Sequence, residues 1–174
     1  MTRLHVPVPL RWADLDAYGH VNNVEVLRLL EEARIAAFWR HGEDVGTWPT
    51  AVLDAGPSAG THTLVARHEV EYLLPVAYRR EPLVVEMWVG RLGGASIDVC
   101  YQLTTGTPAR AAVGPAGGGP VFVQAASTLV LIDAATERPR RITAEERAVW
   151  EPYVEEPVAM RRRPERSAAP DGPA

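Results

Sequence analysis

The chain has 174 residues, 47% of them apolar and 23% charged, which is ordinary for a globular protein with one domain and a substantial core. Its formal net charge of −4 argues against nucleic-acid binding as its main role. All 18 basic residues are arginine, which excludes a Schiff-base or P-loop lysine, and the single cysteine, Cys100, excludes an internal disulfide or a cysteine-based zinc cluster.

The N-terminal part predicts a strand followed by a helix. Residues 3–12 alternate in polarity and contain two prolines, which is typical of a strand near a sheet edge. A helix is predicted from near Val24 to about Arg40, because apolar residues recur on one face at helical spacing, at Val26, Leu30, Ala33 and Ala37. Asn22 and Glu25 have the spacing of a capping box, so the helix should begin at Asn22 or Asn23.

From Thr61 onward the hydrophobic period changes from about 3.6 to 2, which predicts consecutive strands. The predicted strands cover residues 61–74, 83–90, 95–104 and 121–132. Residues 43–60 are interpreted as a short helix or loop, and the segment 105–120, rich in glycine and proline, as a loop or a hairpin extension. A short helix should follow from Thr143, its N-cap, to about Tyr153, with Glu146 completing a capping box.

This order of elements predicts one α+β domain over residues 1–154. Residues 155–174 contain four prolines and mixed charge, and we interpret them as a disordered tail. The helix is apolar on most sides in its first half, so we expect a curved antiparallel sheet to wrap around it. Periodicity alone leads no further than the α+β class.

The stretch before the helix, Arg11-Trp-Ala-Asp-Leu-Asp-Ala-Tyr-Gly-His-Val-Asn-Asn23, holds the candidate chemistry. Asp and Asn are common at any helix start because they cap free N–H groups. Asp16, however, lies about six residues before the predicted start, too far to be the N-cap. A carboxylate near a helix N-terminus faces N–H donors and a positive dipole end, an arrangement suited to acyl transfer.

Asp-Leu-Asp-Ala-Tyr-Gly-His-Val-Asn-Asn, preceded by Arg-Trp and followed by Leu-Glu-Glu-Ala-Arg, resembles the hot-dog-fold acyl-CoA thioesterases of the 4-hydroxybenzoyl-CoA thioesterase branch. The resemblance covers roughly residues 5–153. It implies a hot-dog fold, with one long central helix wrapped by a curved antiparallel sheet. It also implies that Asp16 is the catalytic carboxylate and that Asn23 sits beside it.

This resemblance implies that the reaction is hydrolysis of an acyl-CoA thioester. Asp16 would be a general base or a nucleophile, two roles that the sequence does not separate. Backbone N–H groups around Val21–Asn23 would polarise the carbonyl. Substrate contacts are expected at the motif and at the head of the 95–104 strand, from Gly19, His20, Val21, Asn22 and Ser96. The alternative is a non-catalytic hot-dog module that binds acyl-CoA or serves assembly.

The remaining expectations concern partners. Relatives of this branch pair through their sheets, which implies a homodimer or homotetramer. We expect acyl-CoA as the substrate, but the sequence does not separate a coenzyme A thioester from an acyl-carrier-protein thioester. We expect no cofactor beyond the coenzyme A that the substrate carries, and no metal. With no apolar run of signal-peptide or membrane-span length, we expect a cytoplasmic protein without a membrane or nucleic-acid partner.

Asp14 is expected to be structural, in a pair with Arg11. Four arginines could bind the phosphates of coenzyme A, or be solvated: Arg67, Arg79, Arg80 and Arg91.

Overall fold

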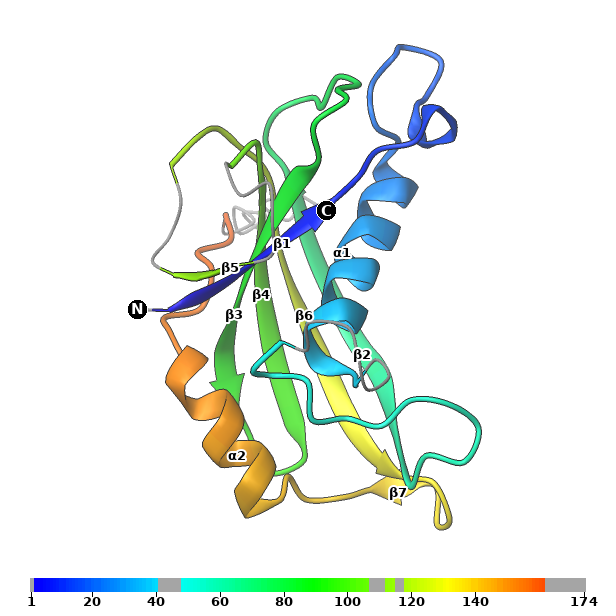
Figure 1. Cartoon of the computed structure of the whole chain (residues 1–174), viewed down its shortest axis with the longest axis vertical. Helices are drawn as coiled ribbons and strands as arrows, with labels where there is room; N and C mark the ends of the chain where they lie inside the picture. Colours follow the sequence, from blue (N-terminus) through cyan, green and yellow to red (C-terminus); the bar gives the residue numbers. More distant parts are fainter. Residues whose placement is uncertain (1, 41–47, 107–111, 115–117, 162–174) are drawn as a thin grey trace, which may run out of the picture.

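The computed structural model describes residues 2–40, 48–106, 112–114 and 118–161. Its architecture is α+β, with one antiparallel sheet, a helix α1 (Asn23–Phe38) against one face and a short helix α2 (Ala144–Trp150) at one end (Figure 1). Two short 3₁₀ turns, η1 (Trp12–Asp14) and η2 (Glu151–Tyr153), complete the described helical elements.

The sheet has seven strands in the order β2-β6-β4-β3-β1-β5, and β7 pairs with β6. Its two ends are therefore β2 and β5, each hydrogen-bonded along one side to its neighbour. A bulge between Val65 and Arg67 shifts the register of β2 against β6. The strands are β1 (Arg3–Val8), β2 (Thr61–Tyr72), β3 (Leu83–Leu92), β4 (Ser96–Thr104), β5 (Ala112–Gly114), β6 (Val121–Asp133) and β7 (Arg138–Pro139).

The predicted strands agree with β2, β3, β4 and β6 to within two residues at each end. The first strand is shorter than predicted: β1 ends at Val8, and η1 begins at Trp12. Within the 105–120 segment, residues 112–114 form β5 beside β1, whereas 107–111 and 115–117 lie outside the described residues.

Helix α1 begins where the cap residues predicted, but it is not the long central helix that we expected. Its 16 residues span about 24 Å, whereas the 13 residues of β6 span about 43 Å. The helix ends at Phe38 rather than Arg40. Asn22 is the N-cap and accepts the N–H of Val24, but Glu25 does not complete a capping box, because its carboxylate pairs with Arg28 instead.

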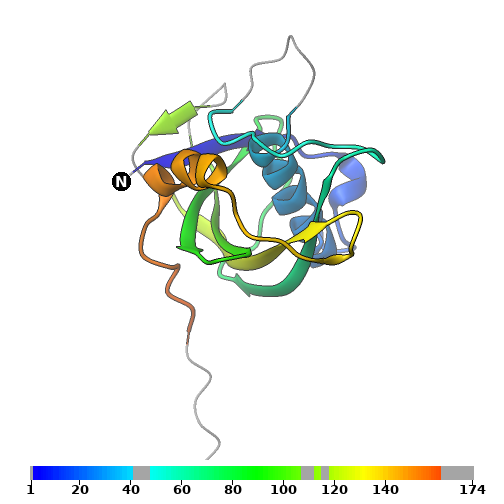
Figure 2. The ribbon, with the colours of Figure 1, turned by 90° about the horizontal axis from the view of Figure 1, so that it is seen from below.

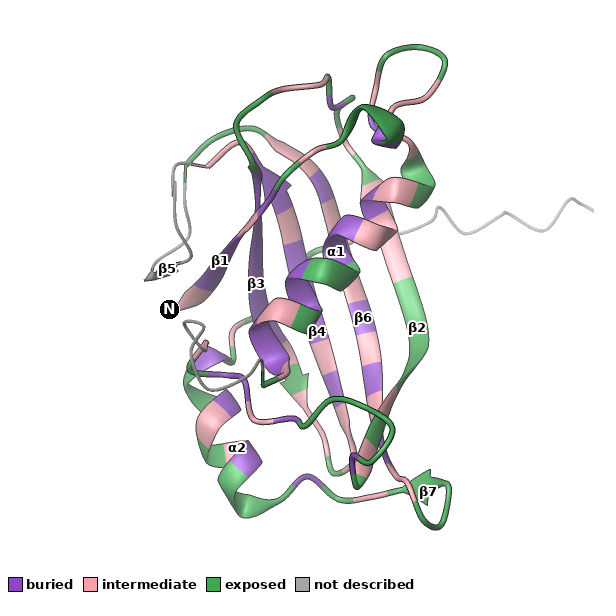
Figure 3. Ribbon diagram, turned by 45° about the vertical axis from the view of Figure 1, so that its right-hand side comes forward, coloured by how far each residue is buried: buried purple, intermediate pink, exposed green. Residues whose placement is uncertain are grey.

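The main core lies between α1 and the concave face of the sheet. The four residues predicted on the inner helix face are all buried, as are Ile97, Val99, Tyr101 and Leu103 on the inner side of β4. Figure 2 shows the sheet curving around the helix, and Figure 3 shows burial concentrated on the strands that face it. A curved antiparallel sheet with a helix in its concavity is therefore the framework of the molecule.

The predicted C-terminal helix is present, with its predicted cap. Thr143 accepts the N–H of Glu146, and the Glu146 carboxylate accepts the N–H of Thr143, so the capping box is complete. α2 ends at Trp150, and η2 continues to Tyr153. The indole of Trp150 is fully buried and donates to the carbonyl of Thr50.

Residues 155–161, which we placed in a disordered tail, lie across the face of the sheet opposite α1. The indole N–H of Trp88 (β3) donates to the carbonyl of Glu156, and the N–H of Val158 points at the sulfur of Cys100 (β4). The amide of Gln124 (β6) donates to the carbonyl of Ala159, and the N–H of Arg161 donates to Glu71 (β2). The rest of the predicted tail, residues 162–174, lies outside the described part of the chain.

Candidate active site

A tight turn between η1 and α1 positions Asp16. Leu15 and Val21 form an antiparallel bridge, and the N–H of Asp16 donates to the carbonyl of His20 over 2.7 Å. The chain reverses through Gly19, whose φ of +77° lies in the left-handed region that glycine adopts without strain. His20 in turn forms a bridge with Ala77, so the turn is joined to the connection between β2 and β3.

Within the described part of the chain, the carboxylate of Asp16 is held by backbone groups only. Its Oδ1 accepts the N–H of Tyr18 over 2.8 Å and the N–H of His20 over 3.1 Å. No described residue donates a hydrogen bond to Oδ2, and none of the described arginines pairs with this carboxylate. Asp16 is half-buried. One of its oxygens is thus fixed while the other is left for a water molecule or a substrate.

Asp16 lines a pocket of about 400 Å³. Its walls come from three segments: the Asp16 turn, the first turn of α1 and the chain that leaves β2. Asn23 and Val26 contribute from α1, and Tyr72 and Val76 from the end of β2 and beyond. Of the predicted site residues, His20 and Val21 also line this pocket. The structure therefore brings the two ends of the motif together around one cavity.

The start of α1 has fewer free N–H groups than we expected. The N–H of Val21 donates to the carbonyl of Val76, and the N–H of Asn22 donates to the carbonyl of Asp14, each over 2.8 Å. Among the described residues, the N–H of Asn23 has no acceptor. Of the three groups predicted to polarise a carbonyl, Asn23 is therefore the one available.

The predicted site residues differ in their surroundings. Asn22 caps the helix through its side chain, and Asn23 is exposed, its carbonyl accepting the hydroxyl of Tyr72 over 3.0 Å. Tyr72 was not predicted as a site residue, because it alternates as an ordinary strand residue. Ser96 lies away from the pocket: it pairs with Val130, seven residues along β6, or about 23 Å, from the pocket residue Val123.

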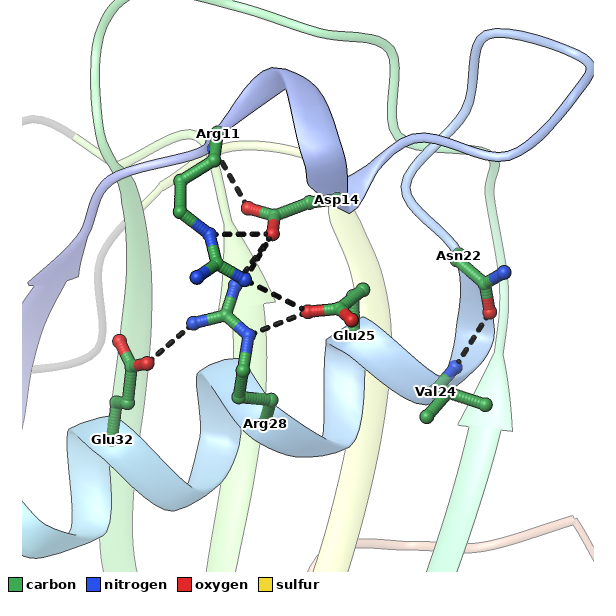
Figure 4. A network of polar contacts seen from close by, with 7 residues as sticks. All are labelled: Arg11, Asp14, Asn22, Val24, Glu25, Arg28 and Glu32. Carbon is green, nitrogen blue, oxygen red and sulfur yellow. Dashed lines mark hydrogen bonds and ion pairs between the residues drawn. The ribbon is translucent and has the colours of Figure 1, made fainter.

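The carboxylate of Asp14 has a different role from that of Asp16. It is fully buried, and it accepts hydrogen bonds from Arg11 and, over 2.8 Å, from Arg28 in α1 (Figure 4). Burial alone raises the pKa of Asp14, but the hydrogen bonds and charges of the two arginines outweigh it and lower the pKa. Glu25 and Glu32 complete the network by pairing with Arg28. Asp14 is therefore a structural anion, as we expected.

In the described ranges, no group of three or more His, Cys, Asp and Glu side chains is arranged to hold a metal ion. None of the described helices is long and apolar enough to cross a membrane.

Known proteins share this sequence pattern and architecture. Residues 10–160 match the thioesterase-like superfamily. A protein of Pseudomonas aeruginosa classed as a thioesterase is 26% identical, with a TM-score of 0.62, over 85% of this chain and 98% of its own. YbaW of Escherichia coli, also classed as a thioesterase, is 25% identical, with a TM-score of 0.62, over 87% of this chain and 99% of its own.

A Thermus thermophilus thioesterase complexed with coenzyme A and zinc is 25% identical, with a TM-score of 0.61, over 86% of this chain and 93% of its own. A comparison with curated proteins gave no match. The curved antiparallel sheet and its helix are consistent with the hot-dog fold of such enzymes. Since the family match covers most of the sequence, the chain belongs to the thioesterase-like superfamily.

Proposed function

We propose that this protein hydrolyses acyl-CoA thioesters and that Asp16 is its catalytic carboxylate. One observation carries the proposal: Asp16 presents an oxygen without a hydrogen-bond donor in the described chain, in a pocket beside the start of α1. The membership of the superfamily supports a thioester hydrolase. The neighbouring Asp14 is buried and held by two arginines, so it is unsuited to contact a substrate.

The start of α1 supplies the complementary electrophilic group. The N–H of Asn23 would donate to the thioester oxygen, where negative charge develops as the carbonyl is attacked. The helix dipole adds roughly half a positive charge at this end. The hydroxyl of Tyr72 holds the carbonyl of Asn23 and so fixes the first turn of the helix against β2. The side chain of Asn23 would orient Asp16 or the attacking water.

The motif and the relatives support the proposed substrate class. The Asp-x-Asp and Gly-His-Val-Asn-Asn segments support the 4-hydroxybenzoyl-CoA thioesterase-like branch. The relative from T. thermophilus is complexed with coenzyme A, which supports a coenzyme A thioester as the substrate here. His20 and Val21 line the pocket and would contact the acyl-CoA, with Gly19 and Asn22 shaping the turn and the cap around it.

We further propose that the protein assembles as a homodimer or homotetramer through β2. This 12-residue strand ends the sheet, and its free edge can pair with a second chain. Leu64 and Val65 are exposed on this strand, and a partner strand would cover them. Tyr72 and Leu74 line the pocket and are about half exposed, so the same partner would also close the site.

Thiol release, followed with a thiol-reactive dye across short, long and aromatic acyl-CoAs, tests the function. Asp16→Ala and Asp16→Asn should each lower kcat by about 10²–10⁴-fold, which is the contribution of a positioned base. Asp54→Asn is the matched control, because Asp54 is an exposed carboxylate paired with Arg40 far from the pocket. Wild-type turnover by a folded Asp16 variant would contradict the assignment of Asp16 as the catalytic carboxylate.

The two roles of Asp16 differ in where the oxygen of water goes. A single turnover in ¹⁸O-labelled water puts the label in the acid product if Asp16 is a general base. If Asp16 attacks the carbonyl, the thiolate leaves and a mixed anhydride forms, and water attack at the aspartyl carbonyl then leaves the label on Asp16. Tight acyl-CoA binding without thiol release would instead favour the non-catalytic binding module.

A further inference from the structure

Two aromatic side chains form an exposed stack at the end of the molecule that carries the pocket. The rings of Trp12 and Tyr78 lie 4.2 Å apart between centroids, with planes inclined by only 16°. The stack covers one face of the indole, yet Trp12 remains 73% exposed, so its other face is open to solvent. Tyr18, on the Asp16 turn, is 85% exposed. Aromatic rings stack favourably on other planar rings, and exposed apolar patches mark sites of interaction.

The stack adjoins two of the three segments that form the pocket walls, the Asp16 turn and the chain that leaves β2. Trp12 precedes Asp16 by four residues, a stretch that spans at most about 14 Å. Tyr78 lies two residues beyond Val76, which lines the pocket, and next to Ala77, which bridges to His20. Figure 1 shows η1 and the connection from β2 to β3 at the same end of the sheet, opposite β7. The aromatic rings are thus within reach of a ligand whose reactive end is at Asp16.

Two arginines follow Tyr78 directly. The Nε of Arg79 is buried and has no hydrogen-bond partner in the described structure, and its Nη2 forms a long ion pair, over 3.7 Å, with the exposed carboxylate of Glu81. Arg80 is exposed and has no ion pair with any described residue. Arg11 and Arg28, by contrast, are neutralised by the half-buried or buried carboxylates of Glu25 and Asp14. Arg79 and Arg80 therefore offer guanidinium donors for an anion next to the aromatic stack.

We propose that Trp12, Tyr78, Arg79 and Arg80 bind the nucleotide end of coenzyme A. The adenine stacks on the open face of Trp12, and the two arginines hold the phosphates. The inference rests on the proposed function, because it requires the thioester of the same molecule to lie at Asp16. The pantetheine arm, longer when extended than the stretch from Trp12 to Asp16, then joins the two ends.

This arrangement distinguishes coenzyme A from an acyl carrier protein. A carrier protein presents the thioester on the same pantetheine arm, but it has a protein in place of the adenine and the 3′-phosphate. An aromatic face and arginine donors at the end of that arm recognise a base and its phosphates. The substrate is therefore a coenzyme A thioester, and the stack contributes binding energy without touching the reacting atoms.

Steady-state kinetics with two substrates test this proposal. Trp12→Ala and Arg80→Ala should raise KM for an acyl-CoA, by about 5- to 100-fold for Trp12, the range that base stacking supplies. The same acyl group on N-acetylcysteamine, which lacks the nucleotide, should lose far less in either variant. Trp12→Phe, which keeps an aromatic face, should recover most of the affinity. Arg138→Ala, an exposed arginine on β7 at the other end of the sheet, is the control.

A binding measurement separates this proposal from the proposed function. Adenosine 3′,5′-bisphosphate should quench the tryptophan fluorescence of the wild type, and Trp12→Phe should abolish that quenching. If acyl-CoA is hydrolysed but the nucleotide neither quenches nor inhibits, the stack is not its site, although the thioesterase stands. Quenching without hydrolysis of any thioester would support the nucleotide site and overturn the proposed reaction. Equal losses on both substrates in Trp12→Ala would show a structural role for the stack instead.

Discussion

The guanidinium of Arg28, in the second turn of α1, lies 2.8 Å from the carboxylate of Asp14 in η1 (Figure 4). The guanidinium of Arg11 donates to the same oxygen, Oδ1. The helix and the chain that precedes it are therefore joined through one buried anion. Because Asp16 follows Asp14 by two residues, this ion pair also fixes where the catalytic candidate begins its turn.

Removal of Arg28 should destabilise the protein measurably. Arg28→Met leaves the buried carboxylate of Asp14 with one arginine, and we expect the free energy of unfolding to fall by about 1–3 kcal/mol. Denaturant unfolding measures the change. Arg40→Met is the matched control: its ion pair with Asp54 is more than half exposed, and its loss should cost less than about 1 kcal/mol. Equal effects of the two variants would contradict a special role for the Asp14 network.

Gly19 should be the least replaceable residue of the Asp16 turn. Gly19→Ala places a side chain at a φ of +77°, which costs about 1–2 kcal/mol or forces the turn to move. Movement would displace the N–H of His20 from Asp16, so we expect kcat to fall at least severalfold in the thiol-release assay. Gly60→Ala is the control, since its added Cβ meets no atom within 4 Å and its φ is not positive. Undiminished kcat in Gly19→Ala would separate the turn from catalysis.

His68 should make stability depend on pH. Its ring bonds the hydroxyl of Ser127 over 2.7 Å, and burial, followed by the charge of Arg34, lowers the pKa of His68 below 6.5, against a smaller opposing effect of Glu31. The unfolded chain therefore takes up the proton more readily than the folded protein. Unfolding free energy should fall as pH drops from about 6.5 through the folded pKa.

Denaturant unfolding at several pH values between 7 and 5 measures this slope. His68→Gln should reduce it. His62→Gln, an exposed histidine on the same strand, should leave it as in the wild type. A slope unaffected by His68→Gln would assign the pH dependence to other groups.

Residues 155–161 should protect Cys100. The thiol is 1% exposed, burial raises its pKa, and Val158 lies over its sulfur. A chain that ends after Val154 should react with a thiol reagent much faster than the full chain and should unfold at lower denaturant concentration. A chain that ends after Arg161 keeps every contact described for this segment, so its thiol should stay protected. Equal labelling rates in both shortened chains would refute the role of the segment.

The proposed assembly through β2 predicts the effect of a charge on that edge. Leu64→Glu should shift the mass in solution from dimer or tetramer to monomer, because a buried charge opposes strand pairing. Light scattering coupled to size-exclusion chromatography measures the mass. Val154→Glu, at an exposed apolar residue outside β2, should leave it unchanged. A Leu64→Glu protein with the wild-type mass would place the interface elsewhere.

Local patterns predicted most of the fold. The inner faces of α1 and β4 were predictable because each depends on the period of its own element. The cap at Thr143 was predictable for the same reason, as its two partners are three residues apart. The capping box expected at Asn22 failed because Glu25 has a competing partner, Arg28, which the box pattern does not include.

Only those residues of the candidate site that are neighbours in the sequence could be predicted. The N–H groups of Val21 and Asn22 are occupied by Val76 and Asp14, and Tyr72 reaches Asn23 from β2. These contacts join residues distant in sequence, and no local pattern reports them. Ser96 illustrates the converse: its place after two glycines suggested a binding role, but the register of β4 puts it far from Asp16.

The path of residues 155–161 also constrains the order in which the molecule can be completed. The segment touches β3, β4, β6 and β2, and it follows all four in the chain. During synthesis it leaves the ribosome after the strands that it covers, so the side of the sheet holding Trp88 and Cys100 stays open to solvent and to chaperones until then. Residues 155–161 therefore cover that side of the sheet late in folding, and the loss of reactivity of the Cys100 thiol shows when this happens.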